Sequence, residues 1–254
     1  MKGEAMEFDM AQAKADISEF NGSLSHLAGD FLMHEFFRGD DFVAAEFEPV
    51  RVLLVDVLWS TQVNREGTRG RREEEKPLHL LCAHLRRQFG ELEERLEPLL
   101  DLDLPEQKPE SVSEHACAAL RLVFETPGMN NKPLSFASKF LHWLAPRCCP
   151  IIDERARTAT HKLLPELWAQ VRLRKQRTGN QALDEKVHKF RRWVKYYSLL
   201  LQKLANAQQE ELTKHDYETQ NHTSEVLARR NTILRVLDKH FWIHGKHLVE
   251  QEQQ

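Results

Sequence analysis

Apolar residues recur at helical spacing along most of this 254-residue chain, and almost no stretch alternates apolar with polar residues as a half-buried strand would. Glycine and proline, which interrupt helices, number only ten each. Residues that favour helices, mainly Leu, Ala, Glu, Lys and Arg, are plentiful. The sequence therefore predicts an all-α fold with enough apolar residues for a buried core.

A chain of this length can form one large domain or two small ones. We expect a single helical domain over residues 1–254, or two helical subdomains at about 24–153 and 154–254. Residues up to Asp153 carry 17 basic and 27 acidic side chains, and the remainder carry 19 and 12. Most of the basic excess lies between Arg155 and Lys203, where it forms either a surface for a polyanion such as the DNA backbone or a solvated helix surface.

Helical periodicity and capping signals place the individual elements. The expected helices cover these residues: 24–37, the mostly apolar segment after Pro49, 78–100, 111–124, 136–145, 154–169, 187–204 and 226–242. The first 20 residues are expected to be a loosely helical lead-in, 205–223 a helix end followed by a loop, and the Gln-rich C-terminal tail frayed.

The segment from Glu125 to Arg157 has the most specific pattern in the chain. A Thr-Pro-Gly turn ends one helix, and a second helix follows with Lys139 and His142 expected opposite its apolar face. That apolar face is formed by Phe136, Ala137, Phe140, Leu141 and Leu144. A short bend containing two cysteines and Pro150 then leads through two Ile residues to Asp153, at the start of a charged helix.

This arrangement resembles the helix-hairpin-helix DNA glycosylase superfamily, whose signature is a Leu-Pro-Gly turn, a lysine in some members, a helix, and an aspartate after a Pro-containing bend. The turn ending at Gly128 is similar to that signature, Lys132 falls four residues after the glycine, and Pro150 to Asp153 is similar to the family's Pro-Val-Asp. The chain departs from the pattern at Asn130, where the family has a second glycine, and in the extra segment 133–135.

A poorly characterised helical branch of that superfamily is similar in a further respect. It closes with an Asp-Lys-x-x-Trp-x-x-Gly-Lys-like element, which is similar here to Asp238, Lys239, Trp242, Gly245 and Lys246.

The resemblance implies a DNA glycosylase-like protein of base excision repair that excises a flipped base, with Asp153 and Lys132 as catalytic residues. With the basic excess, it leads to the following predicted DNA-binding residues: Gln62, Gly128, Asn130, Lys139, Arg155, Arg157, Arg191 and Arg192. The expected partner is DNA, and no oligomeric state is assigned.

Each of the main candidates also has a structural interpretation. Asp153 precedes a helix, where an aspartate is a favoured N-cap. Lys132 could be an ordinary exposed loop lysine, and Gln62 could cap the end of a helix. The alternative function is therefore a non-catalytic helical module that binds DNA or protein on the same scaffold, which the loss of the hairpin glycine at Asn130 favours.

No cofactor is expected. The four cysteines lack CxxC spacing, and none follows Cys149, so neither a zinc site nor the C-terminal iron–sulfur cluster of some glycosylases is expected. His240, His244 and His247 have helical spacing but no accompanying acidic residue of a metalloprotease motif, and no metal is assigned to them. The longest apolar run, 52–59, is too short to cross a bilayer, so we expect a cytoplasmic protein in a reducing compartment, nucleoid-associated if prokaryotic, and no membrane partner.

Overall fold

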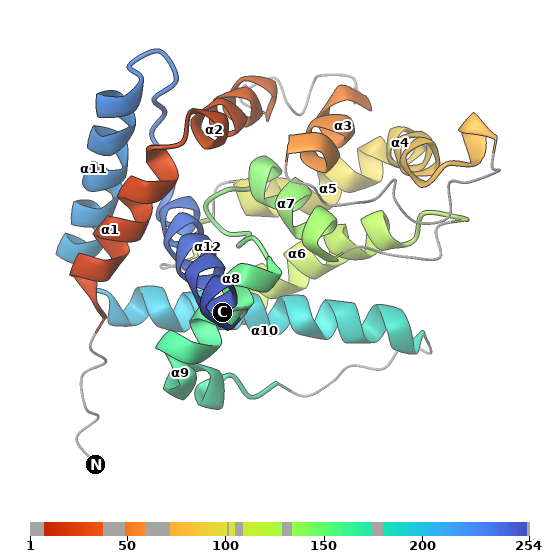
Figure 1. Ribbon diagram of the computed structural model, residues 1–254. Coiled ribbons are helices and arrows are strands. Elements are labelled where there is room, and N and C mark those ends of the chain that lie inside the picture. The colour runs from red at the N-terminus through yellow and green to blue at the C-terminus, as the bar shows by residue number, and fades with distance from the viewer. Residues whose placement is uncertain are drawn as a thin grey trace. The chain divides into compact units, whose positions relative to one another are not determined.

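The computed structural model describes residues 8–37, 49–58, 72–100, 102–104, 109–128, 134–173 and 180–252. Within these ranges the regular structure consists of twelve α-helices and one short 3-10 helix, without a strand (Figure 1). The all-α prediction is therefore confirmed. None of the helices in these ranges is both long and apolar enough to cross a membrane.

The helices form two compact units, each assembled from segments that are distant in the sequence. Unit 1 comprises Met1–Phe31, Asp153–Val171 and Tyr196–Gln254, and unit 2 comprises Leu32–Ile152 and Arg172–Lys195. The chain passes from unit 2 to unit 1 between Ile152 and Asp153. Helices α2 (Leu24–Phe37) and α10 (Gln181–Lys203) each contribute to both units.

Unit 1 is built around its C-terminal helix. Its other helices are α1 (Met10–Asn21), α8 (Glu154–Leu163), α9 (Pro165–Gln170), α11 (Asn206–Thr223) and α12 (Ile233–Glu252). Helix α12 packs against α8, α1 and α11, and α1 also packs against α11 (Figure 1). The helix that closes the sequence therefore contacts three other helices of its unit.

Unit 2 contains the helices on either side of the Thr-Pro-Gly turn. Its elements are α3 (Pro49–Leu58), the 3-10 helix η1 (Glu73–Glu75), α4 (Pro77–Arg87), α5 (Phe89–Leu100), α6 (Pro109–Phe124) and α7 (Leu134–Leu144). Helix α6 packs against both α5 and α7, and α3 packs against α7.

The buried helix predicted at 136–145 is present as α7, but its expected polar face is wrong. Every residue from Phe136 to Leu144 is buried, including Lys139 at 4% and His142 at 1% exposure. The helix is covered all round, so its polar side chains are buried among neighbouring groups instead of facing water.

Several other predicted boundaries are wrong, including that of the helix expected at 154–169, which is divided into α8 and α9 at Leu164. The single helix expected at 78–100 is divided into α4 and α5 at Gln88, whose backbone angles (φ −102°, ψ 17°) are not helical. Gly90 lies beside this break, and glycine lowers helical preference by about 1 kcal/mol relative to alanine. The last helix begins at Ile233 instead of Val226 and continues to Glu252, so the tail expected to fray is helical that far.

Residues 206–223, expected to be a helix end and a loop, form the complete helix α11. Its buried positions are Leu212, Asp216 and Gln220, which are spaced four residues apart. Two of these three side chains are polar, so the buried stripe does not appear in a pattern of apolar residues. The polar groups of Asp216 and Gln220 are satisfied by the hydrogen bonds described below.

Candidate functional site around Asp153

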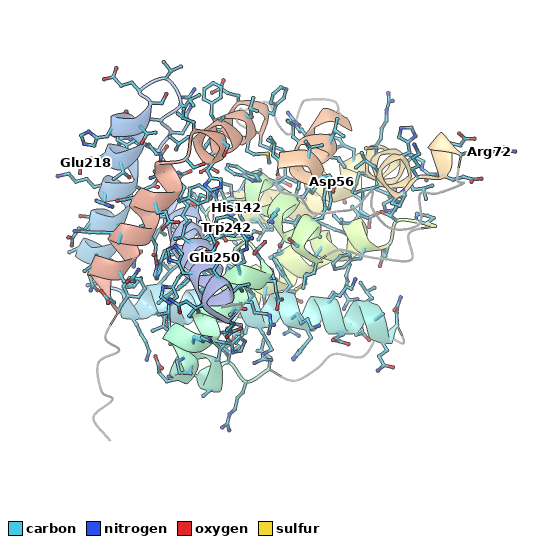
Figure 2. The ribbon with its side chains drawn as sticks, viewed as in Figure 1. Asp56, Arg72, His142, Glu218, Trp242 and Glu250 are labelled. Carbon is cyan, nitrogen blue, oxygen red and sulfur yellow. The ribbon has the colours of Figure 1, made fainter. Side chains whose placement is uncertain are left out.

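The bend that leads to Asp153 is fixed to α7 by two buried side chains of unit 2. The backbone N–H of Ile152 donates to Oγ of Ser138 across 3.0 Å. Nδ1 of His142, a residue labelled in Figure 2, lies 2.8 Å from the carbonyl oxygen of Cys149. Because a carbonyl oxygen can only accept, Nδ1 of His142 must carry the proton. Ser138 and His142 therefore act as internal partners of the bend.

A third buried side chain fixes the bend from α10. The indole N–H of Trp193, which is 2% exposed, donates to the carbonyl oxygen of Ile151 at 2.5 Å. The ring of Trp193 is therefore part of the core. The backbone of the bend is thus held on two sides up to Ile152, the residue before Asp153.

The cysteines of the bend are buried core residues. Cys148 and Cys149 are both fully buried, and all four cysteines of the chain are free thiols. A hydrogen bond with Cys148 and burial raise the pKa of the Cys149 thiol well above its usual value. A protonated buried thiol is a poor nucleophile and a poor metal ligand. Within the described residues, no group of three or more His, Cys, Asp or Glu side chains is placed to hold a metal ion.

Asp153 is the N-cap of α8. Its backbone is extended (φ −124°, ψ 149°), and Oδ1 accepts a hydrogen bond from the backbone N–H of Arg155 at 2.9 Å. The capping interpretation of Asp153 is therefore confirmed. The residue is part-exposed, so its carboxylate is also accessible from solvent.

The two arginines of the first turn of α8 differ in their surroundings, although both are exposed. Arg157 forms a two-point ion pair with Glu154, and this hydrogen-bonded pair raises the pKa of the Arg157 guanidinium. The guanidinium of Arg155 lies over the ring of Trp242 on α12, 4.5 Å from the ring centre. Among the described residues, no carboxylate pairs with Arg155. Its N–H donors are therefore available to a ligand.

The predicted hairpin turn lies in unit 2. Gly128 has φ +76°, in the region that favours glycine, and Oγ1 of Thr126 donates to the carbonyl oxygen of Val123 at 2.9 Å. A Cβ atom at Gly128 would lie 3.1 Å from Cδ1 of Leu80. The backbone angle therefore favours a glycine at the turn between α6 and α7, and a larger residue would also press on the side chain of Leu80.

The other predicted site residues are distributed between the two units. Asp153, Arg155 and Arg157 share one helical turn in unit 1. Arg191 and Arg192 are part-exposed on α10 in unit 2, and Lys139 is buried there, so a phosphate contact through its amine would require that side chain to move outward. The remaining predicted residues, Gln62, Asn130 and Lys132, lie outside the described residues.

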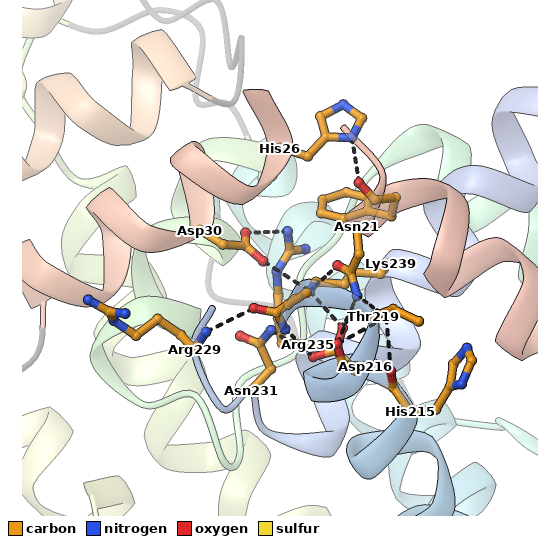
Figure 3. A network of polar contacts seen from close by, with 12 residues as sticks. Asn21, His26, Asp30, His215, Asp216, Thr219, Arg229, Asn231, Arg235 and Lys239 are labelled. Atoms are coloured by element: carbon orange, nitrogen blue, oxygen red, sulfur yellow. Dashed lines mark hydrogen bonds and ion pairs between the residues drawn. The ribbon is translucent and has the colours of Figure 1, made fainter. Parts of the chain in front are cut away.

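A buried polar network in unit 1 was not anticipated from the sequence. Its centre is Lys239 on α12, whose amine donates to Asn21 at 2.8 Å and to Asp216 at 2.7 Å and lies 3.3 Å from Asp30 (Figure 3). Arg235, one turn earlier, pairs with Asp30 at 2.7 Å and with Asp238. All four charged and polar partners of these two cations are at most 5% exposed.

The network extends through α11 to the loop before α12. Asp216 also accepts from Gln220 at 2.7 Å and from Asn231 at 2.9 Å, and Asn21 donates to Thr219 at 2.8 Å (Figure 3). The network therefore links α1, α2, α11 and α12 through charge-assisted hydrogen bonds. Asp238 and Lys239, part of the closing element noted in the sequence, lie inside this network and support the position of α12.

A further buried carboxylate, Asp16 on α1, is paired with two histidines of α12. Its Oδ2 lies 2.8 Å from Nδ1 of His240 and 3.5 Å from Nδ1 of His244. Burial acts to raise the pKa of Asp16, but the hydrogen bonds from His240 and His244 outweigh it and lower that pKa well below its usual value. Burial lowers the pKa of His240. The pair is therefore a neutral imidazole that donates to a carboxylate.

No protein-family model matches this chain, and neither a curated protein nor a solved structure matches it.

Proposed function

We propose that this chain is a DNA glycosylase-like protein of the helix-hairpin-helix type, in which Asp153 assists the excision of a flipped base. The observation that carries the proposal is the placement of Asp153, a part-exposed carboxylate at the start of α8, directly after a bend that three buried side chains hold in place. Positive charge develops on the sugar when the glycosidic bond breaks, and a fixed carboxylate stabilises it.

The cap geometry defines what Asp153 can do. A carboxylate that accepts a backbone N–H is held as an acceptor, which suits electrostatic stabilisation of the sugar better than donation of a proton. Base excision by this route needs the nucleotide outside the helical stack, with the DNA backbone held on either side. Arg155, which lies in unit 1 with Asp153, is the group that we assign to a phosphate.

The test is base excision by the Asp153→Asn variant on a panel of duplexes with damaged bases. Asparagine is as good an N-cap as aspartate, so the melting temperature should remain close to that of the original protein, while excision should be lost with the charge. Glu154→Gln is the matched control, because it removes a carboxylate from the next position of the same turn and should leave excision intact. Equal excision by Asp153→Asn and the original protein would refute the catalytic role.

The second candidate function is a non-catalytic DNA-binding module on the same scaffold. The capping hydrogen bond of Asp153 favours it, because this bond gives the aspartate a structural reason to be there. This alternative predicts that the original protein binds duplex DNA, with an affinity that Asp153→Asn does not weaken, and that it excises nothing from the whole panel.

A further inference from the structure

Two residues on one face of α12 both contact Arg155. Trp242 lies under its side chain, and Gly245, three residues later, lies against its backbone (Figure 2 labels Trp242). Residues three apart on a helix share a face, so a single surface of α12 meets both ends of Arg155.

Gly245 allows the backbones of α8 and α12 to approach closely. A Cβ atom built on Gly245 would lie 2.0 Å from the carbonyl oxygen of Arg155 and 2.5 Å from its carbonyl carbon. These are backbone atoms, which cannot rotate away as a side chain can. Only glycine therefore permits this close crossing of the two helices. The crossing in turn fixes the position of the first turn of α8 relative to α12.

Trp242 is itself held in one orientation. Its ring meets Phe20 edge to face at 6.0 Å and His26 edge to face at 5.3 Å between ring centres, and Phe20 is 1% exposed. A ring braced in this way presents a fixed face to the guanidinium above it. Arg155 is thus oriented by an aromatic surface, with an attraction typical of a cation over an indole.

The neighbouring arginine shows what is distinctive about Arg155. Arg157 is neutralised by Glu154 within its own helix, whereas Arg155 is oriented by an uncharged ring and keeps its positive charge uncompensated by any described carboxylate. A planar guanidinium that rests on an aromatic face keeps its N–H edges free to donate to two oxygens of a phosphate. The surroundings of Arg155 therefore suit an anionic ligand.

We propose that Trp242 and Gly245 are positioning residues that hold Arg155 against a phosphodiester of bound DNA. The proposal rests on the DNA binding of the proposed function, but not on catalysis by Asp153. Trp242 acts through the side chain of Arg155 and Gly245 through its backbone.

The test compares the salt dependence of duplex binding among variants. The logarithm of the affinity falls linearly with the logarithm of the salt concentration, by about 0.9 for each phosphate contact. Arg155→Gln should lower this slope by about 0.9. Trp242→Leu changes no charge, yet it should lower the slope by a similar amount. Trp242→Phe, which keeps an aromatic face, should leave the slope close to that of the original protein.

A double-variant comparison separates positioning from simple destabilisation. Trp242→Leu should have no further effect on the slope when Arg155 is already Gln, but should keep its full effect in the matched Arg157→Gln background. A structural role alone would lower the melting temperature and leave the slope unchanged. Gly245→Ala, if folded, should reproduce the loss seen with Trp242→Leu.

A measurement on the unaltered sequence provides an independent test, should Trp242→Leu or Gly245→Ala fail to fold. The Nε–H proton of Arg155, assigned by its absence from the NMR spectrum of Arg155→Gln, should be shifted upfield by the indole ring and should move when duplex DNA is added. The proposal would be overturned if the Nε–H resonance of Arg155 were unshifted or did not move when DNA is added. Additive effects of the two substitutions on the slope would also overturn it. If the effects of Trp242→Leu and Arg155→Gln on the slope are coupled but the protein excises no base, only the catalytic proposal is overturned. A protein that binds no DNA would overturn both proposals.

Discussion

Lys239 is the residue whose surroundings explain most about unit 1. Its amine is fully buried, and it bridges Asn21 of α1 and Asp216 of α11 from α12. A buried charge is tolerated only where hydrogen bonds and opposite charges replace its hydration. The four buried aspartates of unit 1 outnumber the buried cations, so each cation there is required by more than one partner.

We expect Lys239→Met to lower the free energy of unfolding by about 3–5 kcal/mol, because it leaves the buried carboxylate of Asp216 without its cation. Urea denaturation monitored by circular dichroism measures this change. Lys214→Met is the control, since Lys214 forms an exposed pair with Glu218 and should cost less than about 1 kcal/mol. A loss below about 1 kcal/mol for Lys239→Met would contradict the network as a source of stability.

The burial of His240 predicts that stability decreases in mild acid. Burial lowers the pKa of His240 in the folded protein, so between that pKa and the unfolded value of about 6.5 the unfolded chain binds a proton that the folded chain does not. Stability is therefore fully present above pH 6.5 and is lost as the pH falls below it. The lowered pKa of Asp16 removes further stability below about pH 4.

The measurement is the free energy of unfolding between pH 7 and pH 5. His240→Gln keeps a donor for Asp16 but does not titrate, so its stability should depend less on pH in this range. The same dependence in both proteins would assign the acid sensitivity to another group, and not to His240.

At the level of helices, whether a helix could be predicted from the sequence depended on the kind of residue that it buries. Helix α7 buries Phe136 and Phe140, and its apolar pattern was enough to locate it. Helix α11 buries Asp216 and Gln220, and since each needs partners from elsewhere in the chain, no local pattern could identify it. The hydrogen bonds of Ser138 to the bend were missed for the same reason, because a serine in a helix carries no sign of a partner 14 residues away.

The packing of α7 predicts a large loss of stability for Phe140→Ala. The side chain is fully buried, stacks on Phe136 at 5.9 Å and meets Phe37 edge to face at 6.0 Å. Removing it should leave a cavity and cost about 3–5 kcal/mol. Thermal melting followed by circular dichroism measures this, with Phe36→Ala, at a 39% exposed position, as the milder control. A near-neutral Phe140→Ala would mean that the core around α7 is loosely packed.

Two glycines on helices predict opposite responses to the same substitution. Gly29→Ala meets no atom within 4 Å and should stabilise α2 by up to about 1 kcal/mol, because alanine favours the helix. Gly245→Ala would drive a methyl group into the backbone of Arg155 and should cost about 1–3 kcal/mol or more. Melting temperatures that change in the same direction for both variants would be inconsistent with the close crossing of α8 and α12.

For the molecule as a whole, the sequence determined the fold class more readily than the domain organisation. Helical periodicity is local, so the all-α class could be predicted segment by segment. The assignment of the N-terminal helix α1 to the same unit as α12 depends on pairs such as Asn21 with Lys239, which lie 218 residues apart. Of the candidate site, the cap at Asp153 was predictable from its position before a helix, whereas the contact of Trp242 with Arg155 was not.

The discontinuous makeup of unit 1 has a consequence for how the protein is made. Asp16, Asn21 and Asp30 leave the ribosome early, but their partners on α12 follow more than 200 residues later. At a synthesis rate of about 5–20 residues per second, α1 is made on the order of ten seconds or longer before the helix that pairs with its buried polar residues. Unit 1 can therefore complete its folding only after α12 has been synthesised, and contacts this distant in sequence make that step slow.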